Sequence, residues 1–402
     1  VIKREIVEDK GMKLNLESLK NGEFEGKGYI LPRFDIGAMR ERTKKSPAWL
    51  HFGAGNILRA FPCVLLQTLL ERGGADTGMI VAEAYDEEII TRAFAPYDNL
   101  CLAVSLKSDG SVEKRVVASV AEALGYRANR ARIEEVFVNP GLQMVSMTIT
   151  EKGYAVTDAD GAPLRYCAGD FLSMDDPVSQ MGILARLLHL RYRAGALPVA
   201  MVSLDNCAHN GDILKSGVVA IAESWREKGL ADDGFLDYLT DGTRVSFTWS
   251  MIDKITPRPS EEVVKMLEAD GFTGARVSVT AKNTYVSAMV NAEECEYLAI
   301  EDAFPNGRPR LEAAGVIFAS RETVDRIEKM KVCTCLNPLH TCLAVFGCLM
   351  GYQKISDEMR DDQLSALVRR LGYDEGMPVV VDPGVMSAEK FIGEVINLRF
   401  PN

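Results

Sequence analysis

The residues whose spacing points most directly to chemistry form a glycine-rich turn in the first part of the chain. The segment His51-Phe-Gly-Ala-Gly-Asn-Ile-Leu-Arg-Ala60 reads as a strand that runs through Gly53 and Gly55 directly into a helix. Gly53 permits a tight turn, Gly55 permits close approach of the backbone to a pyrophosphate, and the unpaired N–H groups at the helix start attract its charge. Leu58 replaces the third glycine of the Gly-x-Gly-x-x-Gly pattern, so a plain strand-to-helix turn is the alternative to a dinucleotide site.

The next predicted strand ends in acidic residues of the kind that bind a ribose. In Met79-Ile-Val-Ala-Glu83-Ala-Tyr-Asp86, two carboxylates stand where a ribose-binding acid is usually found. Either would repel a 2′-phosphate and so favour NAD over NADP, although a solvated acid at a strand end is an equally good interpretation. Arg59 is expected either to contact phosphate or to line the cleft. The predicted cofactor-binding residues are Gly53, Gly55, Asn56, Ile57, Arg59, Glu83 and Asp86.

Further polar segments are spread from about residue 48 to the end of the chain. Besides the glycine turn they are Thr148-Ile-Thr-Glu-Lys-Gly-Tyr154, Ser203-Leu-Asp-Asn-Cys-Ala-His-Asn-Gly211, Ser250-Met-Ile-Asp-Lys-Ile-Thr-Pro257, Ile300-Glu-Asp302 and Lys331 through Asn337 to His340. Together they resemble the mannitol dehydrogenase family of long-chain polyol dehydrogenases. The residues in these segments are more similar to those of the members that reduce keto sugar acids than to those of the members that oxidise sugar alcohols.

The resemblance implies a reaction and a cofactor. The expected activity is the NAD-dependent interconversion of a keto sugar acid and its aldonate without a metal, with D-fructuronate and D-mannonate as the first pair. Oxidation of mannitol or arabinitol and reduction of tagaturonate are alternatives within the same chemistry. An inactive nucleotide-binding regulatory protein is the alternative of another class, and the joint presence of Lys331, Asn337 and His340 argues against it.

The resemblance also implies roles for individual residues around one cleft. Lys331 is the expected base, and Glu328, one helical turn earlier, is expected to relay protons from it to solvent. Taken by itself, Lys331 is more typical of a solvated surface lysine, and Asn337-Pro338 is also a good helix start. The implied catalytic residues are Lys331, Asn337, His340, Asn206 and Glu328, and the implied substrate-binding residues are Asp253, Lys254, Asn206 and His340.

A lysine base requires a lowered pKa. Free lysine titrates at about 10.4 and is charged at neutral pH. Burial in an interdomain cleft beside a nicotinamide cation is expected to lower the pKa of Lys331, because desolvation and like charge both disfavour the ammonium form. Asn337 and His340 are expected to donate hydrogen bonds where alkoxide charge develops, so no metal is needed.

The spacing of these residues makes a structural prediction. Lys331 and His340 are nine residues apart, which at about 100 degrees per residue puts them on opposite faces of an unbroken helix. Compared with the family pattern, this chain has one additional residue between the lysine and the asparagine. Pro338 disfavours helical geometry just before it. We therefore expect a break or a π-type bulge between Cys333 and Asn337 that brings the three side chains together.

The elements that must position these residues read as an α/β protein. Apolar strands at Ala48 to Gly53, Met79 to Ala84, Cys101 to Ser105, Gln143 to Thr150 and Val199 to Ser203, with helices at Ile57 to Arg72 and Pro177 to Ala194, predict a Rossmann-like, doubly wound sheet. Residues 1–310 are assigned to this nucleotide-binding domain, and 311–402 to a mainly α-helical domain. Its predicted helices are Leu311 to Ala319, Glu322 to Met330, Leu339 to Tyr352, Asp357 to Leu371 and Ser387 to Leu398. In the family, helical sequence continues past the equivalent of Arg399 to Asn402, so this domain is expected to be truncated.

The charge and composition of the chain limit the classes of partner that it is expected to bind. The net charge of -11 argues against a nucleic-acid binder, and no long uncharged apolar run predicts a membrane span. The start of the chain lacks an apolar signal region, which favours a cytoplasmic protein. The nine cysteines show no zinc-finger spacing, so those from Cys333 to Cys348 are expected to be small apolar residues of a helix. The expected partner is a small sugar acid or polyol, bound by a monomer or a homodimer.

Overall fold

Six parallel strands form the central sheet of the protein, in a computed structural model that describes residues 11–107, 109–258 and 260–401. Their order, β6-β3-β2-β7-β8-β9, is that of a doubly wound dinucleotide-binding sheet, with the direction of winding reversing between β2 and β7. This order confirms the predicted fold class. The strands are β2 (Trp49–Phe52), β3 (Met79–Glu83), β6 (Val120–Gly125), β7 (Met144–Met147), β8 (Val199–Ser203) and β9 (Val245–Thr248).

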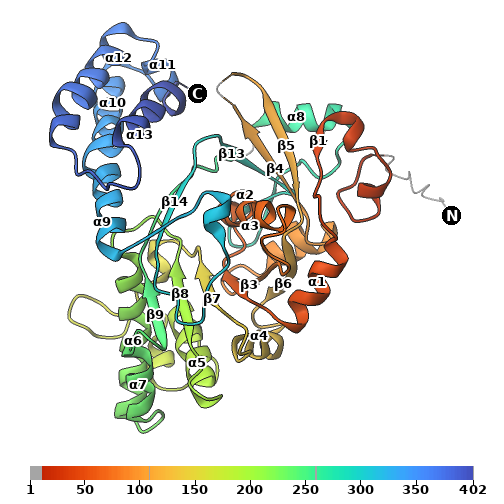
Figure 1. Cartoon of the computed structure of the whole chain (residues 1–402), viewed down its shortest axis with the longest axis vertical. Coiled ribbons are helices and arrows are strands. Elements are labelled where there is room, and N and C mark those ends of the chain that lie inside the picture. The colour runs from red at the N-terminus through yellow and green to blue at the C-terminus, as the bar shows by residue number, and fades with distance from the viewer. Residues whose placement is uncertain (1–10, 108, 259, 402) are drawn as a thin grey trace.

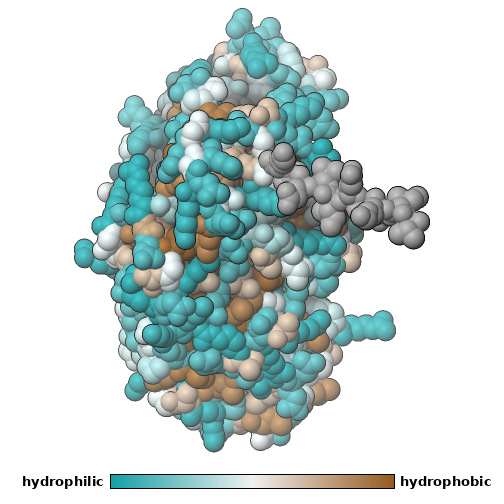
Figure 2. Space-filling view, turned by 90° about the vertical axis from the view of Figure 1, so that its right-hand side faces the viewer, coloured by the Kyte–Doolittle hydropathy of each residue, from teal (hydrophilic) through white to brown (hydrophobic). Residues whose placement is uncertain are grey.

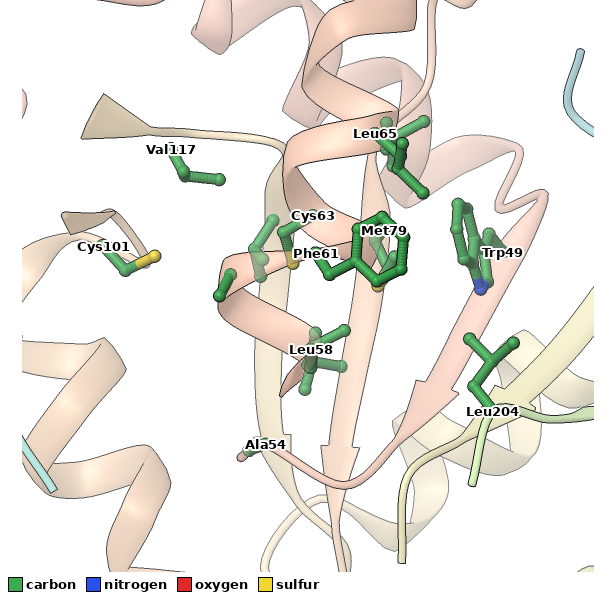
Figure 3. Close-up of a cluster of buried hydrophobic side chains, with 14 of the residues drawn as sticks. Trp49, Ala54, Leu58, Phe61, Cys63, Leu65, Met79, Cys101, Val117 and Leu204 are labelled. Carbon is green, nitrogen blue, oxygen red and sulfur yellow. The ribbon is translucent and has the colours of Figure 1, made fainter. Parts of the chain in front are cut away.

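Helices cover both faces of this sheet, which explains the continuous apolar runs in its strands. Along β3, Met79 and Val81 join the core on one face, and Ile80 and Ala82 join the core on the other. Figure 3 shows the first core, where Phe61 lies beside Met79. The helices are α1 (Ile36–Lys45), α2 (Asn56–Ala60) and α3 (Pro62–Glu71) on this face, and α4 (Arg130–Phe137), α5 (Gln180–Arg193), α6 (Asn210–Glu227) and α7 (Asp233–Thr240) on the other.

Two local predictions about this domain are wrong. The single helix expected from Ile57 to Arg72 is broken at Phe61, whose backbone leaves the helical region (φ −131°, ψ −74°), because Pro62 lacks an N–H and restricts the residue before it. The strand from Cys101 does not join the doubly wound sheet. It forms β4 (Cys101–Leu106), which pairs antiparallel with β5 (Val112–Val117), as two strands separated by so few residues must.

β4 belongs to a second, mixed sheet of four strands, ordered β1-β5-β4-β13. This sheet and α8 lie beside the doubly wound sheet (Figure 1). On the face shown in Figure 2, hydrophilic side chains cover most of the surface and apolar ones form separate patches. The remaining elements of this region are β1 (Tyr29–Ile30), α8 (Glu261–Ala269), β11 (Ser278–Val279), β12 (Tyr285–Val286) and β13 (Met289–Glu293).

A third sheet connects the nucleotide-binding part of the chain with the helical part at its end. β10 (Ser250–Asp253) pairs antiparallel with β14 (Tyr297–Glu301), which pairs in parallel with β15 (Ile317–Ala319). The helix predicted from Leu311 to Ala319 is therefore wrong. Only a short 3-10 turn forms there, and Gly315 (φ 101°) ends it before the strand-forming residues that follow.

The last part of the chain is helical, as predicted, and has its own core (Figure 1). The helical stretch Arg321–Met350, which includes an irregular turn, has 30 residues and is long and apolar enough to cross a membrane by length and composition alone. Its first half is nevertheless a packed element, because Val324 and Ile327 join β10 and β14 in one core. Its last turns expose Phe346 and Leu349. The helices are α9 (Arg321–Met330), α10 (Asn337–Met350), α11 (Ile355–Glu358), α12 (Asp362–Arg369) and α13 (Ala388–Glu394), with π-helical turns at Lys331–Cys335, Arg370–Gly376 and Val395–Arg399.

Candidate active site

Lys331 lies at an interruption of the long helix. α9 ends at Met330, and Lys331–Cys335 form a π-helical turn in which the N–H of Leu336 donates to the carbonyl of Lys331 over 3.0 Å. Leu336 then leaves the helical region (φ −130°, ψ −66°), and α10 starts at Asn337. The bulge expected from the spacing and from Pro338 is confirmed. It absorbs the additional residue, so that Lys331 and the start of α10 face one cavity.

That cavity has a volume of about 1030 Å³ and lies between the carboxyl ends of the central strands and the helical part of the chain. It brings together most residues that the sequence placed in the substrate site: Lys331, Asn337, His340, Asn206, Asp253 and Lys254. Ile57, predicted for the cofactor, also lines it. Polar lining residues that the sequence did not single out are Thr148, Asp205, Thr341, Gln353, Lys354, Ser356 and Arg399.

Lys331 is almost fully buried, with an exposed fraction of 2%. Its ammonium group donates to Oδ1 of Asn206 and to the carbonyl of Ile252, both over 2.9 Å, and lies 3.5 Å from Oδ1 of Asp253. Burial lowers the pKa of Lys331 because the charged form loses its hydration, while the Asp253 carboxylate opposes this effect. A lysine with a lowered pKa that faces a cavity has the properties of a general base.

Asp253 also binds Arg399, a residue that sequence reasoning missed. Arg399 donates to Oδ2 of Asp253 over 2.8 Å and holds both carboxylate oxygens of Glu293 at 2.8 and 2.9 Å. Burial raises the pKa of Glu293, and the guanidinium opposes it. The three side chains therefore form a buried ionic network that fixes the carboxylate next to Lys331.

Asn206 reaches Lys331 from the loop after β8, at the carboxyl end of the sheet where the sequence placed it. The preceding residue, Asp205, holds this loop in place. Its carboxylate accepts hydrogen bonds from the N–H groups of Ile149 and Thr150 and from the hydroxyl of Tyr154. Through these contacts Asp205 joins two of the polar segments recognised in the sequence.

The remaining predicted substrate residues differ in how they are engaged. Asn337 and His340 are exposed on the first turn of α10 and face the cavity. The ammonium group of Lys254 donates to the backbone carbonyl of Glu293 over 2.6 Å and to the carboxylate of Glu296 over 2.9 Å. Glu328 is half-buried and lies outside the described lining of the cavity; burial raises its pKa, and the charge of Lys331 only weakly opposes this. Glu328 therefore makes no direct contact with Lys331 among the described hydrogen bonds and ion pairs, and the proton relay remains a prediction.

The glycine turn has the geometry that a pyrophosphate site needs. Gly53 has a φ of 101°, and a Cβ there would stand 2.2 Å from the carbonyl oxygen of Thr148, so only glycine fits. A Cβ on Gly55 would meet nothing within 4 Å, which leaves open space at the start of α2, where Asn56 and Ile57 follow. The turn can therefore accept a phosphate group against its backbone.

Three residues predicted to touch the cofactor point into the protein instead. Glu83 is 5% exposed and accepts hydrogen bonds from the N–H groups of Ala54, Tyr85 and Asp86, so its carboxylate holds the glycine turn in shape. Asp86 is 3% exposed and binds the hydroxyl of Thr280. These contacts argue against the expected ribose contacts.

Arg59 is engaged in a similar way. It is 1% exposed, and its guanidinium donates to the carbonyl of Ser287 over 2.6 Å and to Oδ1 of Asn56 over 2.8 Å. Both contacts lie inside the protein, which argues against a direct contact between Arg59 and phosphate. Through its hydrogen bond to Asn56, the guanidinium stabilises the first turn of α2.

Replacing each glycine by alanine is expected to weaken NADH binding in both cases but to lower the stability in only one of them. Gly53→Ala is expected to lower the free energy of unfolding by about 1–3 kcal/mol, through strain and overlap with Thr148, and to weaken NADH binding. Gly55→Ala is expected to leave the unfolding midpoint nearly unchanged, because its Cβ has space, yet to weaken NADH binding. Thermal melts and NADH titration of both variants check this; equal melting and equal NADH affinity in the Gly55 variant would contradict the assignment of the turn.

The described part of the chain holds no group of three or more His, Cys, Asp or Glu side chains that could bind a metal ion. All nine cysteines are free thiols. Of those near the end of the long helix, Cys335 is buried in the helical core and Cys333 and Cys348 are exposed. These cysteines therefore differ in burial, and none of them belongs to a potential metal-binding group among the described residues.

Comparisons with known proteins agree with this geometry. Residues 47–313 match the mannitol dehydrogenase Rossmann domain, and residues 323–402 match the mannitol dehydrogenase C-terminal domain. The chain is 48% identical to a D-mannonate oxidoreductase of Thermotoga maritima, over 97% of this chain and 73% of that protein. It is 29% identical to a mannitol 2-dehydrogenase of Cereibacter sphaeroides, over 90% of this chain and 72% of that protein.

Two solved structures share the fold. A D-sorbitol dehydrogenase in substrate-free form aligns with a TM-score of 0.79 at 26% identity, over 93% of this chain and 72% of that one. The mannitol 2-dehydrogenase of Pseudomonas fluorescens, in a ternary complex with NAD and D-mannitol, aligns with a TM-score of 0.77 at 25% identity, over 97% of this chain and 74% of that one. The chain belongs to the mannitol dehydrogenase family.

Proposed function

We propose that the protein is an NAD-dependent oxidoreductase that interconverts D-fructuronate and D-mannonate, with Lys331 as the group that accepts or donates the proton. The observation that carries this proposal is the buried Lys331, which has a lowered pKa and faces a cavity with several polar side chains in its lining, beside a dinucleotide-binding sheet. The substrate class rests on the 48% identity with a D-mannonate oxidoreductase. The cofactor is supported by the family's Rossmann domain and by the relative that binds NAD.

The residues at the glycine turn fit the cofactor. The open space at Gly55 and the first N–H groups of α2, at Asn56 and Ile57, would hold the pyrophosphate. Bound NAD supplies the hydride acceptor for oxidation and, as NADH, the hydride donor for reduction. Ile57 lines the same cavity as Lys331, so the cofactor turn and the proposed base belong to one continuous site.

The contacts of Lys331 suit both directions of the reaction. A neutral amine has two N–H donors and one lone pair, and Asn206 and the carbonyl of Ile252 accept those two hydrogens. The lone pair then remains to take the hydroxyl proton of the aldonate as hydride leaves. In reduction, the protonated amine donates its third hydrogen to the ketone oxygen. Asn337 and His340 would donate to the same oxygen, so the proposed reaction needs no metal.

Turnover of alternative substrates tests this proposal. NADH oxidation is measured with D-fructuronate, D-tagaturonate and D-fructose, with and without a chelator. We expect the highest kcat/KM with D-fructuronate and no loss of rate with the chelator. The relatives named mannitol 2-dehydrogenase and D-arabinitol 4-dehydrogenase make a sugar alcohol the second candidate, at 25–29% identity. Faster turnover of fructose would overturn the first choice.

The Asp253 carboxylate is predicted to tune the base. Because this carboxylate raises the pKa of Lys331, Asp253→Asn removes an opposing effect and lowers that pKa further. Oxidation needs the neutral amine, so its kcat/KM should begin to rise at lower pH in the variant. Glu296→Gln, which removes a carboxylate bound to Lys254 in the same region, is the matched control and should leave the profile in place. An unchanged or upward-shifted profile in the Asp253 variant would contradict the model of the base.

A further inference from the structure

The cationic side chains that line the cavity differ in whether acceptors of the protein itself bind them. Lys331, Lys254 and Arg399 all bind acceptors of the protein itself. Arg399 is engaged at all three of its guanidinium nitrogens, because Nε, Nη1 and Nη2 each donate to a carboxylate oxygen of Asp253 or Glu293. Lys354 also lines the cavity, and among the described residues it has no carboxylate or other side-chain partner.

The backbone around Lys354 is held in place at the edge of the cavity. Gly351 (φ 89°) ends α10 and reverses the chain, and Lys354 is the extended residue (φ −135°, ψ 135°) that begins α11. α11 is anchored by Glu358, which is buried against Gly347 of α10. The side chain of Lys354 therefore belongs to a defined rim of the cavity, together with Thr341 and Ser356.

We propose that Lys354 binds the carboxylate of the substrate and thereby selects a sugar acid over a sugar alcohol. This inference rests on the proposed function. In D-fructuronate the carboxylate lies at the far end of the carbon chain from the ketone that Lys331 serves, so a cation that binds this carboxylate must be a residue other than Lys331. Among the cationic lining residues that the structure describes, Lys354 is the one whose ammonium group has no protein partner, and Thr341 and Ser356 also line the cavity. An uncharged polyol gains nothing from this charge.

The test is Lys354→Gln, which keeps a polar, somewhat shorter side chain and removes the charge. We expect KM for D-fructuronate to rise about tenfold to a hundredfold, the effect of one charge-assisted hydrogen bond, with kcat nearly unchanged. KM for D-fructose, which has no carboxylate, should change less than about twofold, within the range of a neutral surface substitution. The dissociation constant of D-mannonate, measured by calorimetry on the protein with NADH, should rise with KM.

Two controls separate charge from structure. Lys354→Arg keeps the positive charge and should restore most of the affinity for D-fructuronate. Lys265→Gln removes an exposed lysine of α8, outside the cavity, and should behave as the unmodified protein. An equal rise in KM for D-fructuronate and D-fructose would show a structural effect and overturn the inference.

The outcome also distinguishes this inference from the proposed function. If the unmodified protein reduces D-fructuronate while Lys354→Gln leaves KM and the D-mannonate affinity unchanged, the role of Lys354 is overturned and the proposed function stands. If the unmodified protein reduces D-fructose but no keto sugar acid, both are overturned together.

Discussion

Replacing Lys331 with methionine is expected to lower kcat by about a hundredfold to ten-thousandfold in both directions, the usual contribution of a general acid or base. Methionine is an unbranched side chain that fills the same buried space, but it has no proton to give and no lone pair basic enough to accept one. In this variant the side chain of Asn206 and the carbonyl of Ile252 lose their hydrogen-bond donor, and both can accept a hydrogen bond from water in the cavity instead. NADH turnover with D-fructuronate and NAD turnover with D-mannonate measure the effect.

A matched control makes this result specific. Lys329→Met changes a lysine two residues earlier, which is half-exposed and forms an ion pair with Asp325 on its own helix. Its rate should stay within about twofold of the unmodified protein, as for other surface substitutions. NADH binding, followed by fluorescence titration, should be retained in both variants. Undiminished turnover in Lys331→Met would eliminate the proposed base.

Replacing Arg399 with methionine is expected to lower the free energy of unfolding by about 3–5 kcal/mol, the typical cost of removing one partner from a buried ion pair. Arg399 and Asp253 have side-chain exposures of only 5% and 7%, and Glu293 is also largely buried. Without the guanidinium, two carboxylates remain in a region with little water and repel each other. Chemical denaturation of the variant at neutral pH measures the loss.

Neutralising the two acids provides the rescue. In the triple variant Arg399→Met, Asp253→Asn, Glu293→Gln, neither of the two carboxylates that paired with Arg399 remains charged, and most of the lost stability should return even though the ion pairs of Arg399 are gone. The rescue separates the electrostatic origin of the effect from the loss of packing by the arginine stem. A triple variant as unstable as the single one would show that packing dominates.

The parts of the fold that follow from local sequence could be predicted well. The strands at Trp49, Met79 and Val199 are short apolar runs whose side chains are buried on both faces, and a buried parallel strand has that pattern. The π-helical turn after Lys331 could also be foreseen, because Pro338 restricts the backbone just before it. These features depend on neighbours in the sequence.

The misses depend on contacts between distant residues. The identical kind of apolar run at Cys101 entered a different sheet because its partner is β5, which local periodicity does not reveal. Arg399 lies 146 residues from Asp253 and 106 from Glu293, so no spacing rule could join them. The carboxylate of Glu83 stood where a ribose ligand is expected, yet three backbone N–H groups turn it inward.

The pH dependence of kcat/KM in both directions is the most direct test of the claim that Lys331 is the proton-transfer group. Oxidation of D-mannonate needs the neutral amine, so its kcat/KM should rise with pH through one ionisation that lies below the ordinary lysine value of about 10.4. Reduction of D-fructuronate needs the ammonium form and should fall with pH as the same group loses its proton. Profiles that run in the same direction, or an ionisation at the ordinary lysine value, would contradict the account.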